Sequence, residues 1–376
     1  MSDIHQLPDW PNFRYDATAL LGPLSNVAER RGFLIGKLEA LGFGDLQEAK
    51  LNAMAAEATK SSEIEGERLN YDEVRSSIAR KLGMETGGIP MGDRRSEGVS
   101  DIAVDASDHW REPLTSDRLF QWHKRLFPDG RGPYGRIHSG EWRDESSGQM
   151  LVVSGDIGYE LVHFEAPAAN RVEGEMDRFL AWFDRGAERN GILRAAIAHL
   201  WFVTIHPFED GNGRVGRAVL DLALAQSDRR DWRCYSVSEQ ILQERQAYYD
   251  ALQVTQGGTM DVTQWIEWLL GSLARALETA IGRTAAVLSR AGFWHAHAEK
   301  NLNERQRKVL HRMLGDWEGK MTSQKWQKLT GASPKTATRD MVELVEAGIF
   351  LRDEGVRKNA AYVLLWDRSG DIVDKV

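Results

Sequence analysis

Apolar residues recur at helical spacing over much of the chain. In the N-terminal part, intervals of three, four or seven residues separate six apolar positions, Leu20, Leu24, Val27, Leu34, Leu38 and Leu41. These positions lie on one face of a helix. Residues 46–63, rich in Ala, Glu and Leu, predict a second helix, and residues 170–290 have an almost entirely helical pattern. We therefore predict a mainly α-helical protein.

The middle of the chain interrupts this pattern. Residues 84–93 contain several glycines and a proline and predict a loop. Thr115 is a suitable N-cap for a further helix, and turn-forming residues dominate the segment 128–148. Two β-type runs follow, at 150–153 and 160–164, and the glycine-containing segment between them predicts a β-hairpin.

The last part of the chain, from about residue 300, predicts three helices followed by two strands. The helices are expected over 303–314, over 322–330 and from Ser333 to Gly348, and the strands over 349–352 and 360–365. This order is typical of a winged helix-turn-helix domain. Residues 301–366 contain 12 Lys and Arg against 8 Asp and Glu, a local excess of positive charge. The domain could bind DNA through residues 333–347, chiefly Lys335, Thr336, Thr338 and Arg339, or it could be a protein-interaction or dimerisation module.

The composition is that of a globular chain. Of the 376 residues, 42% are hydrophobic and 28% are charged, which excludes a wholly disordered protein. The net charge of −8 excludes a uniformly basic surface for nucleic acid. We find neither a transmembrane-length apolar run nor a secretory N-terminus, so we expect no membrane association. Cys234 is the only cysteine and cannot form an internal disulfide, which favours a cytoplasmic location.

One segment combines the features that hold a phosphate group. Residues 206–217 read HPFEDGNGRVGR and connect an apolar helix to a second helix. Glycines at 211 and 213 allow a ligand to approach the backbone closely. The unpaired N–H groups and the positive macrodipole at the start of the second helix attract an anion. The turn around Gly211 and Gly213 therefore predicts a phosphate-binding cradle.

Side chains suited to phosphate transfer surround this cradle. Arg214 and Arg217 lie three residues apart on one helix face, and each can bind phosphate oxygens through its guanidinium fork. Asp210 offers a carboxylate for Mg²⁺, which prefers carboxylates that it shares with substrate phosphates. His206 can accept a hydroxyl proton near neutral pH. Together these side chains predict in-line attack on a nucleotide phosphate.

The segment 206–217 resembles the HPFx[DE]GNGRxxR signature of the Fic family and matches it at every specified position. Members of that family typically transfer AMP from ATP to a hydroxyl side chain of a target protein. The resemblance implies that His206 is the general base and that Asp210 holds Mg²⁺. It also implies a set of ATP-binding residues: Gly211, Asn212 and Gly213 as an anion hole, and Arg214 and Arg217 on the phosphates. The family's helical core would cover roughly residues 50–285.

The same resemblance concerns the hairpin and a downstream tyrosine. Family members carry a β-hairpin flap whose edge clamps a target segment by β-augmentation. Here Met150, Leu151, Val152 and Val153 would dock the target, although an ordinary edge hairpin has the same pattern. Tyr249, in the sequence SEQILQERQAYYDAL, would contact the adenine or ribose of ATP, with core packing as the alternative.

Upstream, residues 61–66 read SSEIEG and resemble the [ST]xxxE[GN] inhibitory motif of Fic proteins, with Ser61, Glu65 and Gly66 at its specified positions. Ser61 and Glu65 are four residues apart and share a helix face. In the family, this glutamate pairs with the second arginine of the signature, here Arg217, and blocks productive binding of the ATP γ-phosphate. A bidentate pair would remove a phosphate ligand and add a repelling carboxylate. A capped, solvated helix end is the alternative.

We therefore expect an N-terminal helical extension over 1–45, a Fic catalytic domain over 46–290 with an inhibitory helix near 50–66, and a winged helix domain over 300–376. The predicted function is Mg²⁺- and ATP-dependent protein adenylyltransferase, acting on a target protein or on the chain itself and auto-inhibited by Glu65. One alternative is the same fold using another nucleotide donor or removing AMP. Another is a nucleotide-sensing transcription regulator. The family habit also suggests a homodimer.

Overall fold

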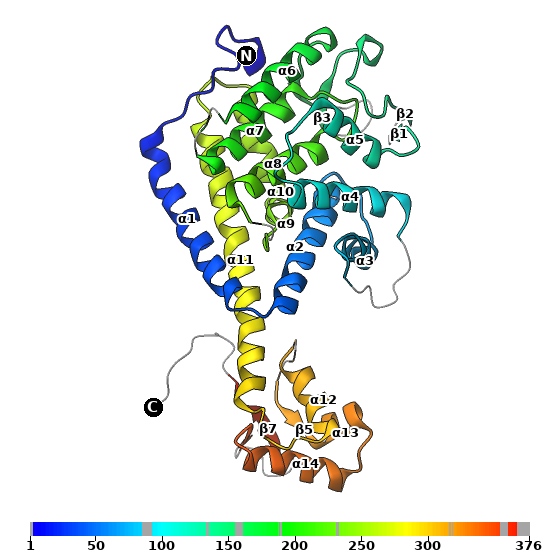
Figure 1. Ribbon diagram of the computed structural model, residues 1–376, viewed down its shortest axis with the longest axis vertical. Helices are drawn as coiled ribbons and strands as arrows, with labels where there is room; N and C mark the ends of the chain where they lie inside the picture. Colours follow the sequence, from blue (N-terminus) through cyan, green and yellow to red (C-terminus); the bar gives the residue numbers. More distant parts are fainter. Residues whose placement is uncertain are drawn as a thin grey trace. The chain divides into compact units, whose positions relative to one another are not determined.

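Helices make up most of the described residues in both units into which the chain divides (Figure 1). The computed structural model describes residues 3–84, 92–132, 135–154, 161–186, 188, 190–230, 233–315, 317, 319–353 and 360–366. The first unit is Met1–Ile281 and the second is Gly282–Val376, so their boundary lies within the long helix α11 (Thr263–Ala296). The predicted mainly α-helical class is confirmed, and the finer division into three domains stays a prediction.

The first unit contains the helices that precede α11 and two short β-ribbons. Its helices are α1 (Ala17–Glu39), α2 (Phe43–Ile64), α3 (Tyr71–Lys81), α4 (Arg94–Asp108), α5 (Ser116–Leu126), α6 (Ala169–Arg185), α7 (Gly191–Ile205), α8 (Asn212–Asp228), α9 (Val237–Gln243) and α10 (Arg245–Gln256). Single 3-10 turns are η1 (Ile4–Gln6) and η2 (Glu145–Ser147). The ribbons are β1 (Arg131–Gly132) with β2 (Gly135–Arg136), and β3 (Leu151–Ser154) with β4 (Leu161–Glu165). Among the helices of the described residues, none is both long and apolar enough to cross a membrane.

Helices α7 and α8 form the centre of the first unit, and residues 206–211 connect them. Helix α7 is buried on almost every side, including every residue from Ala195 to Ile205. A helix that is apolar all round belongs in the middle of a core. Helix α6 packs on α7, whereas α2, α4 and α5 pack on α8. The connecting segment is therefore held between two buried helices.

The helix predicted first along the chain is present as α1. Its inward face buries four of the six predicted positions, Leu20, Val27, Leu34 and Leu38, and the other two are partly buried. The carboxylate of Asp16 caps the helix by accepting hydrogen bonds from the backbone N–H groups of Thr18 and Ala19. An ion pair between Arg30 and Glu278 connects α1 with α11.

The sequence pattern did not predict helices α3 and α4. Each begins at a side-chain cap, Asn70 for α3 and Asp93 for α4. Their buried faces include small polar residues, namely Ser76, Ser77, Ser96 and Ser100. Because serine does not count as apolar, the helical period of these two segments is weak. The predicted loop at 84–93 lies mostly outside the described residues.

The predicted hairpin is present as the antiparallel pair β3–β4. Leu151 and Val152 lie opposite Glu165 and Phe164, after which the register shifts between Val152 and Val153. Such a bulge bends the bulged strand and increases the local twist. The predicted turn between the strands lies mostly outside the described residues. Phe164 is buried and Leu151 is exposed, so one side of the ribbon packs on the unit.

The second unit follows the predicted order of elements. Its helices are α12 (Glu304–Met313), α13 (Ser323–Thr330) and α14 (Pro334–Glu346), and its strands are β5 (Met321–Thr322), β6 (Phe350–Asp353) and β7 (Ala361–Leu364). The antiparallel sheet has the order β5-β7-β6. Gly348, with φ of 73°, ends the α14 region in a left-handed conformation, as its position predicts. Strand β5 was not predicted, and the classification as a winged helix stays an interpretation.

Candidate functional site

Two residues in the left-handed conformation shape the turn between α7 and α8. His206 has φ of 53° and ψ of 58°, and Gly211 has φ of 78°. This conformation is free of strain for glycine but costs energy for histidine. A Cβ atom at Gly211 would lie only 2.8 Å from the ring of Phe127, so both the conformation and the space favour glycine there.

The side chain of Asn212 closes the turn on itself. Its Nδ2 donates to the carbonyl oxygen of Phe208 at 2.7 Å, and its Oδ1 accepts from the N–H of Phe208 at 2.9 Å. Both ends of the amide are therefore occupied within the turn. What Asn212 and Gly213 can offer an anion is their backbone N–H, because the first N–H groups of a helix have no intrahelical acceptor. This arrangement fits the predicted anion hole.

The imidazole of His206 has a defined tautomer. Its Nδ1 lies 3.2 Å from the carbonyl oxygen of Val203, and only a protonated Nδ1 can donate there. The lone pair consequently resides on Nε2. Burial, with a smaller contribution from the nearby Arg143 charge, lowers the pKa of His206 to about 4. The ring is therefore neutral at pH 7, which is the state that a general base requires.

Arg143, which sequence reasoning missed, supports the backbone of this histidine. Its side chain is buried, and its Nε donates to the carbonyl oxygen of His206 at 2.8 Å. Its Nη2 donates to the carbonyl oxygens of Pro167 and Ile205. The backbone N–H of Arg143 donates to the carbonyl oxygen of Pro207 at 2.9 Å. One side chain thus joins the end of α7 to the start of the turn. No sequence spacing links position 143 with 206.

Two further buried histidines support the turn. Nδ1 of His123 accepts from the N–H of Gly140 at 2.9 Å, so its Nε2 carries the proton and donates to the carbonyl oxygen of Asp210 at 3.1 Å. The His123 ring also stacks on Phe208 with centroids 4.1 Å apart. His199 contacts the carbonyl oxygen of Gly216 through Nδ1 at 2.9 Å. Sequence reasoning missed both residues.

Asp210 has one carboxylate oxygen engaged and one unpaired. Its Oδ1 accepts from the N–H of Gly211 at 2.5 Å and lies 3.8 Å from Arg214 Nη2. Its Oδ2 is buried and has no hydrogen-bond partner among the described residues. Burial raises the pKa of Asp210 in spite of Arg214 and the hydrogen bond from Gly211, so the ionised form is only partly compensated. A cation at Oδ2 would supply that compensation.

These features fit Mg²⁺ better than a metal held by protein ligands alone. No group of three or more His, Cys, Asp or Glu side chains in the described part of the chain could hold a metal ion. Mg²⁺ is commonly held by one or two carboxylates together with substrate phosphates. The unpaired Oδ2 of Asp210, next to the N-terminus of α8, suits such a shared site.

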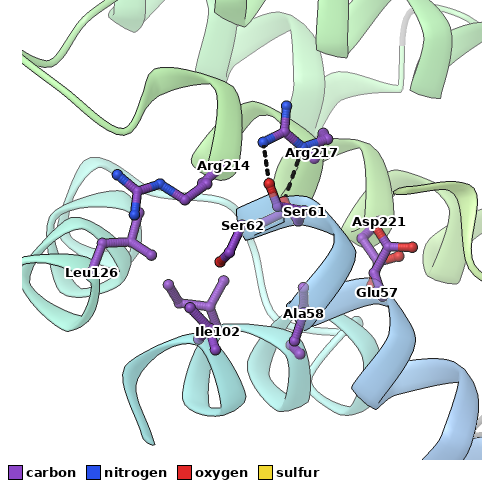
Figure 2. A pocket seen from close by; sticks show the side chains of 13 residues that line it. Glu57, Ala58, Ser61, Ser62, Ile102, Leu126, Arg214, Arg217 and Asp221 are labelled. Carbon is purple, nitrogen blue, oxygen red and sulfur yellow. Dashed lines mark hydrogen bonds between the residues drawn. The ribbon is translucent and has the colours of Figure 1, made fainter. Parts of the chain in front are cut away.

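Arg217 is almost fully buried, with 1% of its side chain exposed, and it contacts the end of α2. Its Nη2 lies 2.8 Å from Glu65 Oε1. Its Nε and Nη2 also donate to the hydroxyl and the carbonyl oxygen of Ser61, at 2.9 and 2.8 Å (Figure 2). The predicted Glu65–Arg217 pair is therefore formed through one carboxylate oxygen and is not bidentate: Nη2 is shared with Ser61, Nε donates to Ser61, and Nη1 has no hydrogen-bond partner among the described residues. Ser61, Glu65 and Arg217 lie together as the resemblance implied.

The carboxylate of Glu65 lies against the phosphate cradle itself. A Cβ atom at Gly213 would come within 2.1 Å of Glu65 Oε1. The other oxygen, Oε2, accepts from the hydroxyl of Tyr249 at 3.3 Å. Burial opposes ionisation of Glu65, but the charge and hydrogen bond of Arg217, the charge of Arg214 and the hydrogen bond from Tyr249 together outweigh it, so the pKa of Glu65 lies below its ordinary value. An ionised carboxylate thus lies at the N-terminus of α8, where an anionic ligand would bind.

Tyr249 differs from its neighbour Tyr248 in its surroundings. Tyr248 is buried, and its hydroxyl lies 2.9 Å from Nε2 of His199. Tyr249 is half-buried and contacts Glu65. Core packing therefore describes Tyr248, whereas Tyr249 lies at the edge of the cradle. A role on the adenine or ribose stays a prediction.

A small cavity adjoins the contact between α2 and α8 (Figure 2). Its volume is about 40 Å³, and it is lined by Ser61, Ser62, Arg214 and Arg217 together with apolar residues of α4 and α5. Ser62 Oγ is buried without a hydrogen-bond partner among the described residues. A water needs only about 10–15 Å³ of such space, whereas ligand pockets have roughly 300 Å³ or more. The cavity can therefore hold water but not a nucleotide.

The predicted flap residues lie at the start of the β3–β4 ribbon. Met150 and Val152 are half-buried, and Leu151 is exposed. The backbone of Met150 already accepts a hydrogen bond of 2.9 Å from the N–H of Ala166. The side chain of Val153 lies outside the described set. The role of this ribbon in docking a target stays a prediction.

A family model and curated relatives point to the same family as the signature at residues 206–217. Residues 113–224 match the Fic/DOC family model, and residues 4–84 match a domain of unknown function, DUF4172. "Protein adenylyltransferase Fic" of Culex quinquefasciatus is 25% identical over 261 residues, which are 67% of this chain and 46% of that protein. "Uridine 5'-monophosphate transferase" of Xanthomonas campestris pv. campestris is 25% identical over 170 residues, 42% of this chain and 28% of that protein. The chain therefore spans less than half the length of these curated relatives.

Solved structures agree at the level of the fold. A Fic family protein from Desulfovibrio desulfuricans matches 93% of this chain and 97% of its own, with a TM-score of 0.54 and 22% identity. A Fic domain-containing signaling protein from Bacteroides thetaiotaomicron matches 69% of this chain and 97% of its own, with a TM-score of 0.51 and 18% identity. Taken together, the family model and the relatives support a Fic-type domain in this chain.

Proposed function

We propose that this chain transfers AMP from ATP to a hydroxyl side chain of a target protein, or of itself, and releases pyrophosphate. The observation that carries the proposal is the state of His206: a neutral imidazole with its free lone pair on Nε2, at the end of α7 where the turn into α8 begins. A base beside an anion-binding helix terminus suits deprotonation of an alcohol that attacks a phosphate. The names of the matching relatives support a nucleotidyl transferase of the Fic kind.

In the proposed reaction, the acceptor hydroxyl oxygen attacks the α-phosphorus of ATP and gives its proton to Nε2 of His206. The bond between the α-phosphorus and the oxygen that bridges to the β-phosphate breaks, and pyrophosphate leaves with the electron pair. The N–H groups at Asn212 and Gly213 and the guanidinium groups of Arg214 and Arg217 hold the phosphate oxygens. Mg²⁺, shared between Asp210 and the phosphates, would neutralise part of their charge.

The proposal includes self-restraint by Glu65. Its carboxylate occupies the space above Gly213 and takes one donor of Arg217. A phosphate at the same place would meet both steric overlap and charge repulsion. ATP binding in a productive position therefore requires the Glu65 carboxylate to leave this place.

The experiment is intact-mass measurement after incubation with Mg²⁺ and each of the four nucleoside triphosphates in turn, on wild type, Glu65→Gly and His206→Ala. A gain of one AMP unit by the chain or an added target, absent in His206→Ala, would support the proposal. Calorimetric titration with ATP provides a second readout. If Glu65→Gly neither binds a nucleotide nor becomes labelled, the proposal is overturned.

A second candidate is UMP transfer, which the printed name of the Xanthomonas relative favours. The same chemistry applies with UTP as the donor, and the four-nucleotide comparison distinguishes the two. A gain of one UMP unit in place of AMP would select this candidate.

The second unit is proposed to contact DNA through residues 333–347. Lys335, Thr338 and Arg339 are exposed on α14, and Arg339 lies 3.7 Å from Glu343. A gel-shift assay over increasing salt should show steeply weakening binding if lysine and arginine contact phosphates. No shift at low salt would favour the protein-interaction alternative. A homodimer is also proposed, and light scattering tests it.

A further inference from the structure

A second carboxylate–arginine pair lies beside the one between Glu65 and Arg217. Glu67 Oε2 lies 2.7 Å from Arg214 Nη1, and the exposed fraction is 22% for the Glu67 side chain and 11% for the Arg214 side chain. The other oxygen of Glu67 lies 3.3 Å from Nη1 of Arg95 on α4. Sequence reasoning singled out Glu65 and gave Glu67 no role. Both arginines of the signature are consequently paired with carboxylates from one three-residue segment, Glu65-Gly66-Glu67.

The end of α2 explains how two glutamates so close in sequence contact different arginines. Gly66 has φ of 86°, its N–H donates to the carbonyl oxygen of Glu63 at 3.0 Å, and the N–H of Glu67 donates to that of Ser62 at 3.0 Å. This pair of bonds is a Schellman motif, which ends a helix and redirects the chain. Glu65 therefore belongs to the last turn of α2, whereas Glu67 follows the change of direction.

Arg214 has a second support that is independent of Glu67. Its guanidinium lies over the ring of Phe127, 4.9 Å from the centroid. Its Nε is buried and has no hydrogen-bond partner among the described residues, and the same holds for Nη1 of Arg217. Nη1 of Arg217 lies 3.2 Å from the Cβ position of Gly213. Both arginines thus keep an unused donor, that of Arg217 beside Gly213, and an anion with several oxygens could take such a donor.

We propose that Glu67 is a second competing carboxylate, which opposes the binding of nucleotide phosphates at Arg214 as Glu65 does at Arg217. The proposal rests on the proposed function, in which the signature binds a nucleoside triphosphate. In this arrangement each arginine of the signature contacts a carboxylate where the proposed function requires a phosphate oxygen. Removal of Glu65 alone therefore leaves Arg214 paired with Glu67. The effect depends on the β- and γ-phosphates, so AMP is not opposed in the same way.

The experiment compares Glu65→Gly, Glu67→Gln and the double variant by calorimetric titration with AMP, ADP and ATP in the presence of Mg²⁺. Glu63→Gln is the matched control, because Glu63 is on the same turn of α2 but pairs with Lys60. In the Glu65→Gly background we expect Glu67→Gln to tighten ATP binding about tenfold, as expected when one closely placed like charge is removed. The Kd for AMP should change little in any variant, and Glu63→Gln should resemble wild type.

The outcomes separate this inference from the function on which it rests. If the double variant binds ATP no tighter than Glu65→Gly, or more weakly, Glu67 does not compete and instead has no role or orients Arg214. If no variant binds any of the three nucleotides, the proposed function itself fails. Thermal unfolding of each variant establishes that it is folded, and Glu67→Ser replaces Glu67→Gln if the latter is not.

Discussion

Nε of Arg143 donates a hydrogen bond of 2.8 Å to the backbone carbonyl oxygen of His206. The arginine is buried, and it also donates to the backbone carbonyl oxygens of Ile205 and Pro207, on both sides of the histidine, and to that of Pro167. His206 is in a left-handed conformation, which persists only where surrounding contacts hold it. Arg143 is therefore a positioning residue: it fixes the backbone from which the imidazole projects.

Substitution of Arg143 by Lys should separate positioning from nucleotide binding. Lysine keeps the charge but cannot donate in several fixed directions. We expect the labelling rate to fall by about 10²-fold, the cost of displacing a catalytic group by roughly 1 Å, while the Kd for ATP stays within about twofold. Labelling kinetics and calorimetry on the Glu65→Gly background measure the two effects. Arg136→Lys, at an exposed arginine, is the control. An unchanged labelling rate would contradict the positioning role.

Removal of the Glu65 carboxylate should release activity. Glu65→Gly clears the space above Gly213 and frees one donor of Arg217, so labelling with ATP should rise by about tenfold or more. Glu65→Gln, which keeps the shape and loses the charge, should lie between wild type and Glu65→Gly. Time courses with labelled ATP measure the rates, and adding His206→Ala should abolish the signal. Equal labelling by wild type and Glu65→Gly would exclude restraint by this residue.

The phosphate cradle could be predicted from the sequence because its geometry is local. Gly211 and the helix start at Asn212 are adjacent in the chain, so the left-handed glycine and the free N–H groups follow from the residue types. The same holds for the helix end at Gly66. The face shared by Ser61 and Glu65 depends only on helix periodicity, and both contact Arg217.

The supports of the site could not be predicted, because they depend on contacts distant in sequence. Arg143 and His123 lie 63 and 87 positions from the backbone groups that they hold. Nothing in the residue types around them distinguishes a buried support from a surface residue. Glu67 was missed for a related reason: the motif ends at Gly66, and the course of the chain after Gly66 decides that Glu67 meets Arg214.

The pH dependence of labelling should report the environment of His206. Burial lowers its pKa from the ordinary 6.5 to about 4, so the ring stays neutral until the pH approaches 4. The rate of Glu65→Gly should therefore be nearly constant from about pH 8 down to about pH 5 and fall below that. Initial rates across this range, with saturating ATP, provide the test. A half-maximal rate near pH 6.5 would mean that the imidazole is not desolvated.

Two buried histidines should make stability fall in mild acid. Burial lowers the pKa of His123 and His199 to about 4, whereas unfolded histidine titrates near 6.5. Between these values the unfolded state binds more protons, so stability is full above pH 6.5 and decreases toward pH 4, by about 1.4 kcal/mol per pH unit for each histidine. Urea unfolding of wild type and His199→Gln measures this slope. His109→Gln, at an exposed histidine, is the control. Equal slopes for wild type and His199→Gln would contradict the prediction.

Substitution of Asp210 by Asn should remove the Mg²⁺ dependence of ATP binding without weakening the fold. Asparagine keeps an oxygen for the N–H of Gly211 and removes a charge whose pKa burial raises, so the melting temperature should stay equal or rise slightly. The lost carboxylate is the proposed Mg²⁺ ligand. On the Glu65→Gly background with Asp210 intact, ATP should bind more tightly in the presence of Mg²⁺ than in the presence of EDTA. With Asp210→Asn added, the Kd for ATP should be the same under the two conditions. Labelling should be lost. A variant that still binds ATP more tightly with Mg²⁺ would place the metal on other groups.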